Sequence, residues 1–400
     1  MRERFIKYVK LTPRGRVYSS DCPVCKDIGS VIFHDDGTWV CMTCGKKGKE
    51  EDYLAEVRGI PVQKARCLLE GIPYVKETNS DVNSPENSLI LRANGIAQKY
   101  YSAKLFSKEG ETALSYFKKR GLSTTTIRKL NLGFADGHLL EELKKNGFSD
   151  KELIECRLVR KSERFGENYD FFRNRVIFPI LNEAGQTVGF GGRAMDDSKP
   201  KYINSPESGV FEKRSLLYGL YAPGAYKAGS PFVLCEGYMD VISMYQAGVR
   251  NAVATLGTAL TPDHAKLIRS YTDNVLLCYD SDEPGTKAAE RAVPILEEEG
   301  ISSGVVSFRP AKDPDEFTKK YGASELIKRF DRRENSFLFS VRQSARQFDL
   351  KKDDQKGAFV ENVARKILAE KRNRNIYVRE ISRIYQIPEE VFWTVIEYLE

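Results

Sequence analysis

The chain has 400 residues, which predicts two or three domains, and its hydrophobic fraction of 41% is enough to build real cores. Lysine and arginine number 63 against 56 aspartates and glutamates, so the net charge is +7 and a nucleic acid is a compatible partner. The first ten residues are charged throughout and no stretch reaches membrane-spanning length. These features exclude a signal peptide and a membrane partner, and they favour a cytoplasmic protein.

Four of the eight cysteines form two Cys-x-x-Cys pairs near the start of the chain, Cys22 with Cys25 and Cys41 with Cys44. Each pair predicts a tight knuckle with two thiolates, and the 15 residues between the pairs are enough for a short hairpin that brings the knuckles together. Two such pairs, the second followed by Gly45, predict a structural Zn²⁺ site in preference to a redox motif or disulfides. The other four cysteines stand alone and are expected to be buried.

The residues between the two cysteine pairs predict a hairpin, with strands at 30–33 and 38–40 and a turn signal at 35–37. A zinc ribbon follows from this hairpin. Phe33 and Trp39 are candidates to stack on the bases of a single strand, while nearby lysines neutralise its phosphates. The alternative is that an aromatic ring fills the small core of the ribbon, and for Trp39 the sequence leaves both interpretations open.

Three segments between the ribbon and residue 130 differ in pattern. Residues 50–69 have helical periodicity that is interrupted at 59–61, which predicts two short helices packed on the zinc module. The segment 76–88 is polar, lacks large apolar residues and is interpreted as a flexible linker. From 89 to about 130 the pattern is helical with aromatic residues in a core stripe, and the basic run 118–120 is interpreted as a solvated helix face.

Carboxylates follow short apolar runs in the second half of the chain, as they do where buried parallel strands end at a site. The first run ends at Glu236 and the second at Asp280 and Asp282, which lie two residues apart and point to one side of an extended backbone. A single acid of this kind is often a solvated loop residue, but several on successive strands need a divalent cation, which predicts Mg²⁺. The candidate ligands are Glu236, Asp240, Asp280, Asp282, Asp313 and Asp315.

Basic residues near these acids have the chemistry of a phosphate cradle, because guanidinium groups grip phosphate bidentately and a lysine supplies a point charge. The candidates are Arg175, Arg193, Lys201 and Lys213. Arg193 follows two glycines, which allow close approach of a ligand or form a tight turn, and the sequence leaves both open.

The acidic segments resemble the Toprim domain, with its glutamate motif and its Asp-x-Asp motif, which topoisomerases, recombination proteins and primases share. Upstream and intervening segments are similar to signature segments of bacterial and phage DnaG-type DNA primases. These segments are Arg173-Asn-Arg-Val-Ile-Phe-Pro-Ile180, Val188-Gly-Phe-Gly-Gly-Arg193, Pro200-Lys-Tyr-Ile-Asn-Ser-Pro-Glu207, Leu256-Gly-Thr258 and Thr261-Pro-Asp-His264. The resemblance runs almost without a break from about 130 to 317.

The resemblance implies an α/β fold in which a Toprim-type, Rossmann-like parallel sheet lies within an α+β primase catalytic domain. An N-terminal zinc ribbon and a C-terminal helical segment flank it. The implied domains are a zinc-ribbon DNA-binding domain at 1–75, a linker at 76–88, the N-terminal part of the RNA polymerase core at 89–225, the Toprim subdomain at 226–330 and a helical region at 331–400.

The resemblance also implies roles for the matched residues. The catalytic residues are Glu236, Asp280 and Asp282, where the aspartates bind Mg²⁺ or Mn²⁺ and Glu236 is either a ligand or a general base. The positions that hold template or nucleotide are Arg175, Arg193, Lys201, Tyr202 and Lys213. The chain departs from the family at Asp136, where proline is usual, and in its first knuckle, where Cys-x-x-His is common.

The predicted function is that of a DNA primase, which starts RNA chains on single-stranded DNA from ribonucleoside triphosphates and releases an RNA primer for DNA replication. We expect a monomer, and the C-terminal region resembles the beginning of a module that binds the replicative helicase. One alternative is a Toprim nuclease or topoisomerase-like enzyme, although no segment recommends itself as the source of a tyrosine nucleophile. The other is a non-catalytic zinc-ribbon adaptor that binds single-stranded DNA, against which the complete set of acids argues.

Overall fold

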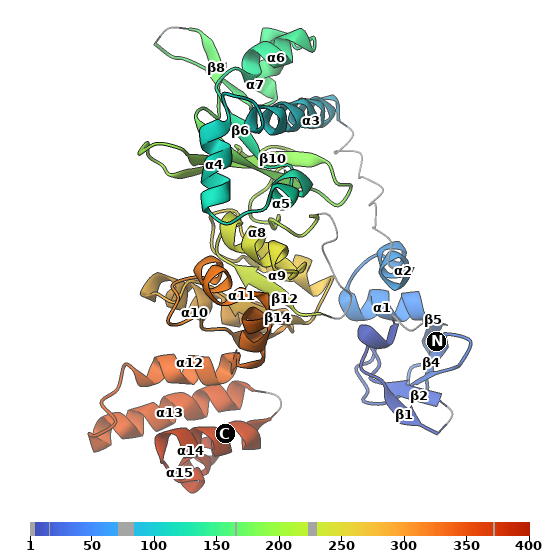
Figure 1. The fold of residues 1–400 in the computed structure, drawn as a ribbon. Coiled ribbons are helices and arrows are strands. Elements are labelled where there is room, and N and C mark those ends of the chain that lie inside the picture. Colours follow the sequence, from blue (N-terminus) through green and yellow to red (C-terminus); the bar gives the residue numbers. More distant parts are fainter. Residues whose placement is uncertain (1–4, 16, 71–83, 165, 223–229, 371–372) are drawn as a thin grey trace.

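The computed structural model describes residues 5–15, 17–70, 84–164, 166–222, 230–370 and 373–400. Figure 1 shows a small N-terminal lobe beside a body of three parts, which follow one another along the chain from top to bottom of the view. Within the described residues, no helix is both long enough and apolar enough to cross a membrane.

The N-terminal lobe is an antiparallel sheet whose strands pair in chain order and are followed by two short helices. The strands are β1 (Thr12–Arg14), β2 (Val17–Ser20), β3 (Val31–Phe33), β4 (Thr38–Cys41) and β5 (Lys47–Lys49), after a 3₁₀ turn at Phe5–Lys7, and the helices are α1 (Glu50–Arg58) and α2 (Val62–Glu70). Gly37 turns the β3–β4 hairpin with a positive φ of 81°, and Gly59 ends α1 with a φ of 63°. The predicted hairpin and the two short helices are therefore confirmed.

Aromatic rings fill the core of this lobe. Phe33 and Trp39 are each 1% exposed, and both rings pack against Tyr53 of α1, with centroid distances of 4.8 and 5.2 Å. The Trp39 indole N–H donates to the Lys49 carbonyl at 3.0 Å. The expectation that Phe33 is exposed for base stacking is wrong, and of the two interpretations left open for Trp39 the core one is confirmed, because a small sheet needs these rings to fill its core.

The second part begins with α3 (Pro85–Leu105), which starts where the Ser84 hydroxyl accepts a hydrogen bond from the Asn87 N–H. The end of the predicted linker, 85–88, is thus helical, while 76–83 lies outside the described residues. The antiparallel sheet of this second part has the strand order β11-β10-β9-β6. The elements are α4 (Glu111–Lys119), α5 (Thr124–Lys129), β6 (Gly133–Ala135), α6 (Leu139–Lys145), α7 (Asp150–Glu155), β7 (Val159–Lys161), β8 (Asn168–Asp170), β9 (Arg175–Leu181), β10 (Thr187–Ala194) and β11 (Tyr202–Asn204).

The third part is an open sheet of order β13-β12-β14-β15-β16, in which the first four strands are parallel and β16 is antiparallel. Its elements are β12 (Phe232–Cys235), α8 (Tyr238–Gln246), β13 (Ala252–Ala254), α9 (Pro262–Arg269), β14 (Asn274–Cys278), α10 (Glu283–Glu298), β15 (Ser302–Val305), α11 (Pro314–Asp331) and β16 (Glu334–Asn335). β12 and β14 are neighbours, and Cys235 lies opposite Cys278. Ligands of such sheets bind at the carboxyl ends of the strands, where these two strands stop together.

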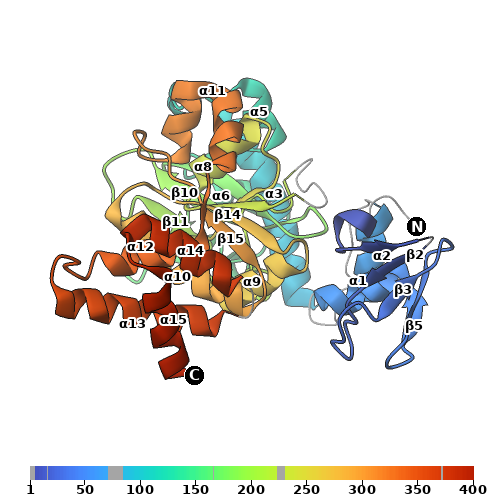
Figure 2. The same cartoon turned by 90° about the horizontal axis from the view of Figure 1, so that it is seen from below.

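The chain ends in four helices with a core of their own, as the amphipathic pattern from about 335 predicts. They are α12 (Ser336–Ala345), α13 (Asp353–Ala369), α14 (Arg374–Tyr385) and α15 (Glu389–Leu399). In Figure 2 they lie against the side of the third part that carries α10, far from the N-terminal lobe.

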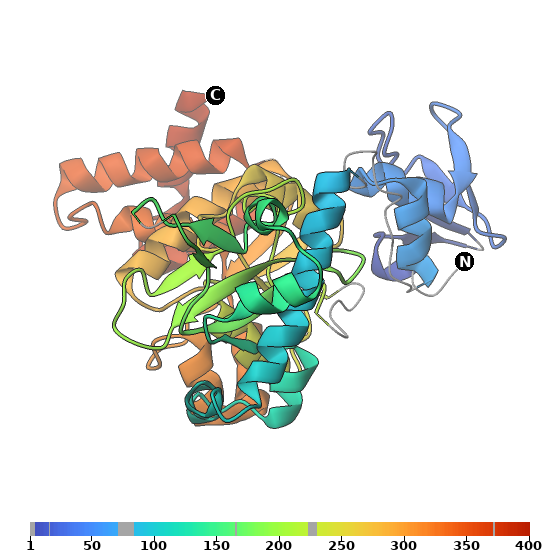
Figure 3. The ribbon, with the colours of Figure 1, turned by 90° about the horizontal axis from the view of Figure 1, so that it is seen from above.

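The N-terminal lobe meets the body through two buried cations of its helices. Lys64 Nζ lies 3.1 Å from Glu183 Oε1 and 4.4 Å from the centroid of the Tyr271 ring. Arg58 donates to the Arg269 carbonyl at 3.5 Å. Figure 3, seen from above, shows that the rest of the lobe projects away from the body.

Candidate active site and metal centre

The four paired cysteines converge at one end of the N-terminal sheet. Their sulfur atoms all lie within 4.8 Å of one another, and the Cys22–Cys44 and Cys25–Cys41 Sγ distances are both 3.7 Å. Tetrahedral Zn²⁺ with Zn–S bonds of about 2.3 Å needs S···S distances of roughly 3.8 Å. Backbone N–H groups of Cys25 and Cys44 point to the first sulfur of their own pair at 3.4 Å. The cluster thus has the chemistry and spacing of a tetrahedral metal site.

The carboxyl ends of β12 and β14 bring two of the predicted acids into contact. The Asp280 N–H donates to Glu236 Oε1 at 2.9 Å. Asp282 is the N-cap of α10, where its Oδ1 accepts from the Gly285 N–H at 3.0 Å. Burial, together with the charges of Glu236 and Asp313, raises the pKa of Asp280 to about 6. Burial and the Asp282 charge also raise the pKa of Glu236.

Asp240 belongs to the first turn of α8 and lies near the other acids. It is 9% exposed, and its Oδ2 accepts from the Gly237 N–H at 3.2 Å. Burial raises the pKa of Asp240 well above its ordinary value, and the charges of Asp313, Asp280 and Asp315 add to the rise. Like charges held together in this way favour a bound cation.

The two acids at the start of α11 differ in their partners. Asp313 caps the helix by accepting from the Glu316 N–H at 2.7 Å. Asp315 is 2% exposed, and its Oδ2 pairs with Arg120 at 2.5 Å and Lys319 at 2.6 Å. Its Oδ1 is buried, and the described residues give it no hydrogen-bond partner. That oxygen is available to a metal ion, while the other is not.

One of the acids, Asp282, borders an open hollow of about 550 Å³, whose lining also includes Arg309 and Lys312. Lys312 Nζ lies 3.6 Å from Asp280 Oδ2. Among the described residues, only the cysteines have three or more ligand atoms within 4.8 Å of one another, so the carboxylates surround a wider space. Oxygen donors around a space of this kind fit hard divalent cations that keep some of their water.

A basic and aromatic wall faces the acids from the second part of the body. The Arg193 guanidinium lies 4.4 Å from the centroid of the Tyr116 ring. Tyr202 is 41% exposed, and its ring stacks at 6.3 Å on that of Tyr238. Burial raises the pKa of Tyr202 to about 12, and the electrostatic neighbours of this hydroxyl include Arg193 and Asp240. The wall and the acids are therefore close in space.

Arg175 has a different environment from the other predicted cradle residues. Its side chain is buried, and it donates to the carbonyls of Gly192, Pro200 and Lys201 at 3.1–3.2 Å. These contacts hold the loop that presents Lys201, whose own side chain is exposed. The arrangement gives Arg175 a positioning role, and its direct contact with a phosphate stays a prediction.

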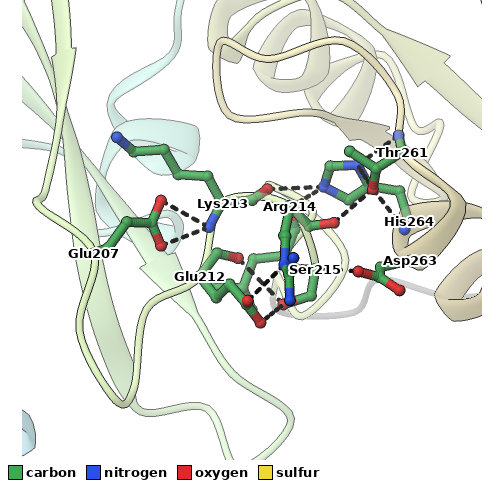
Figure 4. Close-up of polar contacts among 9 residues, drawn as sticks. Glu207, Glu212, Lys213, Arg214, Ser215, Thr261, Asp263 and His264 are labelled. Carbon is green, nitrogen blue, oxygen red and sulfur yellow. Dashed lines mark hydrogen bonds and ion pairs between the residues drawn. The ribbon is translucent and has the colours of Figure 1, made fainter.

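Lys213 lies on a loop that is fastened to the start of α9, as Figure 4 shows. The ring of His264, which is fully buried, contacts the Lys213 carbonyl at 2.9 Å through Nε2, and its Nδ1 lies 2.9 Å from the Thr261 hydroxyl. Thr261 in turn donates to the Arg214 carbonyl at 2.6 Å. Burial lowers the pKa of His264, so a neutral ring holds the loop.

Two family models match the body of the chain: "DNA primase catalytic core, N-terminal domain" over residues 100–223 and "Toprim-like" over 233–318. A DNA primase of Clostridium acetobutylicum is 33% identical over 400 residues, which cover 97% of this chain and 66% of that protein. The chain belongs to the DnaG-type primase family. Its parallel sheet is thus a Toprim domain, and its mixed α/β architecture is the one that the resemblance implies.

Two solved primase structures have the same fold. The zinc-binding and RNA polymerase domains of the Aquifex aeolicus primase have a TM-score of 0.63 and 29% identity, covering 97% of this chain and 94% of theirs. A DnaG primase catalytic domain bound to single-stranded DNA has a TM-score of 0.66 and 29% identity, covering 77% of this chain and 99% of that one. This chain spans 54–66% of the length of the curated primases that it matches.

One departure from the primase pattern has a structural explanation. Asp136 stands where proline is usual, and its carboxylate accepts from the Tyr100 hydroxyl at 2.9 Å and pairs with Lys104 at 3.0 Å. Both partners belong to α3. The aspartate therefore ties the end of β6 to that helix.

Three residues of this site had no role in the sequence interpretation. Lys312 adjoins Asp313 in the sequence, and a lysine beside clustered acids is a pattern that could have identified it as part of the site. Arg120 belongs to the run interpreted as solvated, but its ion pair with Asp315 joins positions 195 residues apart. His264 was visible only as part of a family segment, and its contact with the Lys213 loop depends on the tertiary fold.

Proposed function

We propose that this chain is a DNA primase, which synthesises short RNA primers de novo on single-stranded DNA by nucleotidyl transfer. The observation that carries the proposal is the group of acids at adjacent strand ends, facing a wall of basic and aromatic side chains. The match to a primase domain bound to single-stranded DNA supports a template of the same kind here.

The four cysteines, Cys22, Cys25, Cys41 and Cys44, would hold a structural Zn²⁺, since their sulfur spacing fits tetrahedral coordination. The lobe then contacts the template through its surface lysines, because its large rings are committed to the core. Lys46, Lys47 and Lys49 lie next to the cysteine cluster and are the candidates for this contact.

Asp280 and Asp282 would hold the catalytic divalent cations, Mg²⁺ or Mn²⁺, with Asp240, Asp313 and Asp315 as further ligands. When bound, a pair of such ions stabilises the attacking 3′-oxygen and the departing pyrophosphate. Glu236 already accepts the Asp280 N–H, so it is a ligand and an anchor of that loop in preference to a general base.

The remaining residues would bind and orient the polymer and the nucleotide. Arg193 and Lys201 would bind phosphates, and Tyr202, whose ring is partly exposed, would stack on a base. Lys213 adds a charge that the His264 contact keeps in place. Lys312, close to Asp280, is suited to the phosphates of the incoming nucleotide.

The wider assignments belong to the same proposal. The substrates are ribonucleoside triphosphates, the protein acts as a monomer in the cytoplasm, and the helices at 331–400 form part of a helicase-binding module. We assign separate roles, as the family resemblance implies, to the zinc-ribbon domain at 1–75, a linker that ends before α3 begins at Pro85, the core that α3 opens and that runs to 225, and the Toprim subdomain at 226–330.

The test is a primer synthesis assay with mixed-sequence single-stranded DNA, Mg²⁺ and labelled ribonucleotides, in which products are resolved by length. We expect short RNA from the parent chain and a loss on the order of a hundred-fold or more for Asp280→Asn. Asp331→Asn, an exposed aspartate at the end of α11, is the matched control and should retain full activity.

Other outcomes of that assay contradict the proposal. Shortened or relaxed DNA without RNA would indicate a Toprim nuclease or topoisomerase-like enzyme. DNA binding without any product, unchanged by Asp280→Asn, would indicate an adaptor that uses the zinc-ribbon lobe alone.

A further inference from the structure

A crevice of about 130 Å³ lies between the Toprim domain and the first of the C-terminal helices. Its walls come from the loop after β14, the start of α10, the segment after β15 and one face of α12. Figures 1 and 2 both show α12 beside this edge of the sheet, and α12 contacts β15 directly. The crevice is distinct from the hollow that adjoins Asp282 and Lys312, although Ser281 and Arg309 border both.

Three guanidinium groups line the crevice. Arg342 makes a bidentate pair with Glu334 at 2.9 and 2.6 Å, so its charge is balanced. Arg309 and Arg346 are exposed, and among the described residues no carboxylate lies within ion-pair distance of either. Two uncompensated positive charges that line one crevice attract an anion.

The one carboxylate at the edge of the crevice does not cancel these charges. Asp280 borders it, but its Oδ2 lies 3.6 Å from Lys312 Nζ on the side of the catalytic hollow. Asp280 is therefore balanced by a cation that does not line the crevice.

Neutral polar groups complete the lining. The Ser307 hydroxyl and the Gln343 amide, which is 7% exposed, add hydrogen-bond donors to the lining. The ring of Phe339 forms an apolar wall. Because a cavity of about 150 Å³ admits a molecule of the size of benzene, this crevice holds one or two phosphate groups and not a whole nucleotide.

We propose that this crevice binds a diphosphate group, from free pyrophosphate or from a nucleotide whose sugar and base project out of it. Arginine is suited to phosphate oxygens because its planar fork donates two parallel hydrogen bonds. Arg309 follows β15 and Arg346 follows α12, so the two guanidinium groups come from different elements and two linked phosphates can contact both, while a single phosphate contacts fewer donors.

The crevice is connected to the loop that carries two candidate metal ligands. Ser281 stands between Asp280 and Asp282, its carbonyl accepts from Arg309 Nη2 at 3.2 Å, and its N–H donates to the Lys312 carbonyl at 2.7 Å. A diphosphate that binds Arg309 competes with the Ser281 carbonyl for the same guanidinium. A diphosphate bound in the crevice would thus weaken the hydrogen bond that holds the loop of Asp280, Ser281 and Asp282 in position.

The test is calorimetric titration of sodium pyrophosphate into the zinc-loaded full chain at low ionic strength, without added Mg²⁺ or Mn²⁺, so that no such cation recruits the anion to the acids. We expect one saturable site and a loss of affinity of about ten-fold or more for Arg346→Glu. Arg365→Glu, on α13 of the same module, should change the affinity by less than about two-fold.

Comparison of ligands distinguishes the two sources. Equal affinity for pyrophosphate and ADP supports recognition of the diphosphate alone, and tighter binding of ADP supports a nucleotide as the source. Orthophosphate that binds as tightly as pyrophosphate overturns the diphosphate assignment. No saturable binding, or binding that Arg346→Glu leaves unchanged, overturns the site; circular dichroism of each variant shows that it is folded.

Discussion

The cysteine cluster and the acidic cluster are both candidate metal sites, but they are built in opposite ways. All four cysteines come from 23 consecutive positions, 22–44, within one small sheet, and their sulfur atoms lie within 4.8 Å of one another. The acids come from two strand ends and three helix starts between 236 and 315. The first site is closed and local, whereas the second is wide and depends on the whole Toprim sheet.

This difference indicates what each site does. A closed set of thiolates leaves no open coordination position, which is typical of a structural metal that stabilises a small lobe. Carboxylates around a wide space repel one another and leave room for water, substrate phosphates and more than one cation. Substitutions in either site can break this contrast between a closed structural site and an open catalytic one, and loss of the zinc site has the largest expected effect.

Replacement of Cys41 by serine should abolish the fold of the N-terminal lobe, because structural zinc contributes about 10–16 kcal/mol of apparent binding free energy in small zinc domains. Zinc content should fall to near zero, and the emission of Trp39 should shift to the red as its ring enters water. Cys67→Ser, at a lone cysteine of α2, is the control and should keep its zinc. A Cys41→Ser protein that retains one zinc ion would show that the cluster is not the site.

Replacement of Trp39 by alanine should lower the free energy of unfolding of the lobe by about 3–5 kcal/mol, because the ring is fully buried. Trp39→Phe should cost less and should leave the affinity for single-stranded DNA unchanged. Thermal unfolding and fluorescence anisotropy with labelled DNA measure the two effects. If Trp39→Phe weakened DNA binding without loss of stability, the ring would be a base platform and not part of the core.

Replacement of Asp280 by asparagine should make the metal-free protein more stable at neutral pH. The folded-state pKa is raised from 3.8 to about 6, so the stability that protonated Asp280 contributes is fully present below pH 4 and is lost as the pH rises to about 6. The asparagine removes this loss, which corresponds to at most about 3 kcal/mol. Denaturant unfolding at pH 4 to 8 in EDTA measures it, with Asp331→Asn as the control. Parallel pH profiles for Asp280→Asn and the parent would contradict the clustered-acid account.

Much of this arrangement could be predicted from the sequence, because the signals are local. An apolar run that ends in Glu236, and another that ends in Asp280, identify two strands and the sheet edge where they stop. The two Cys-x-x-Cys pairs with a turn signal between them identify the hairpin that joins them. In each case the residue type and its spacing carry the information.

The direction of a long side chain could not be predicted, because it depends on distant parts of the chain. Arg175 is turned onto the carbonyls of its own sheet and the adjoining loop, and Arg120 reaches Asp315 from another domain. The burial of Trp39 depends on Tyr53, a residue of the following helix. Each of these outcomes was decided by tertiary packing, on which a sequence pattern is silent.

The central claim is that the acids of the Toprim sheet, and not the cysteines, hold the exchangeable divalent cations. Titration of Mn²⁺ into the zinc-loaded chain, followed by electron paramagnetic resonance, tests it most directly. The account predicts that Asp280→Asn weakens Mn²⁺ binding by about ten-fold or more, while Asp331→Asn and Cys41→Ser leave it unchanged. Mn²⁺ binding that is unaffected by Asp280→Asn would contradict the account.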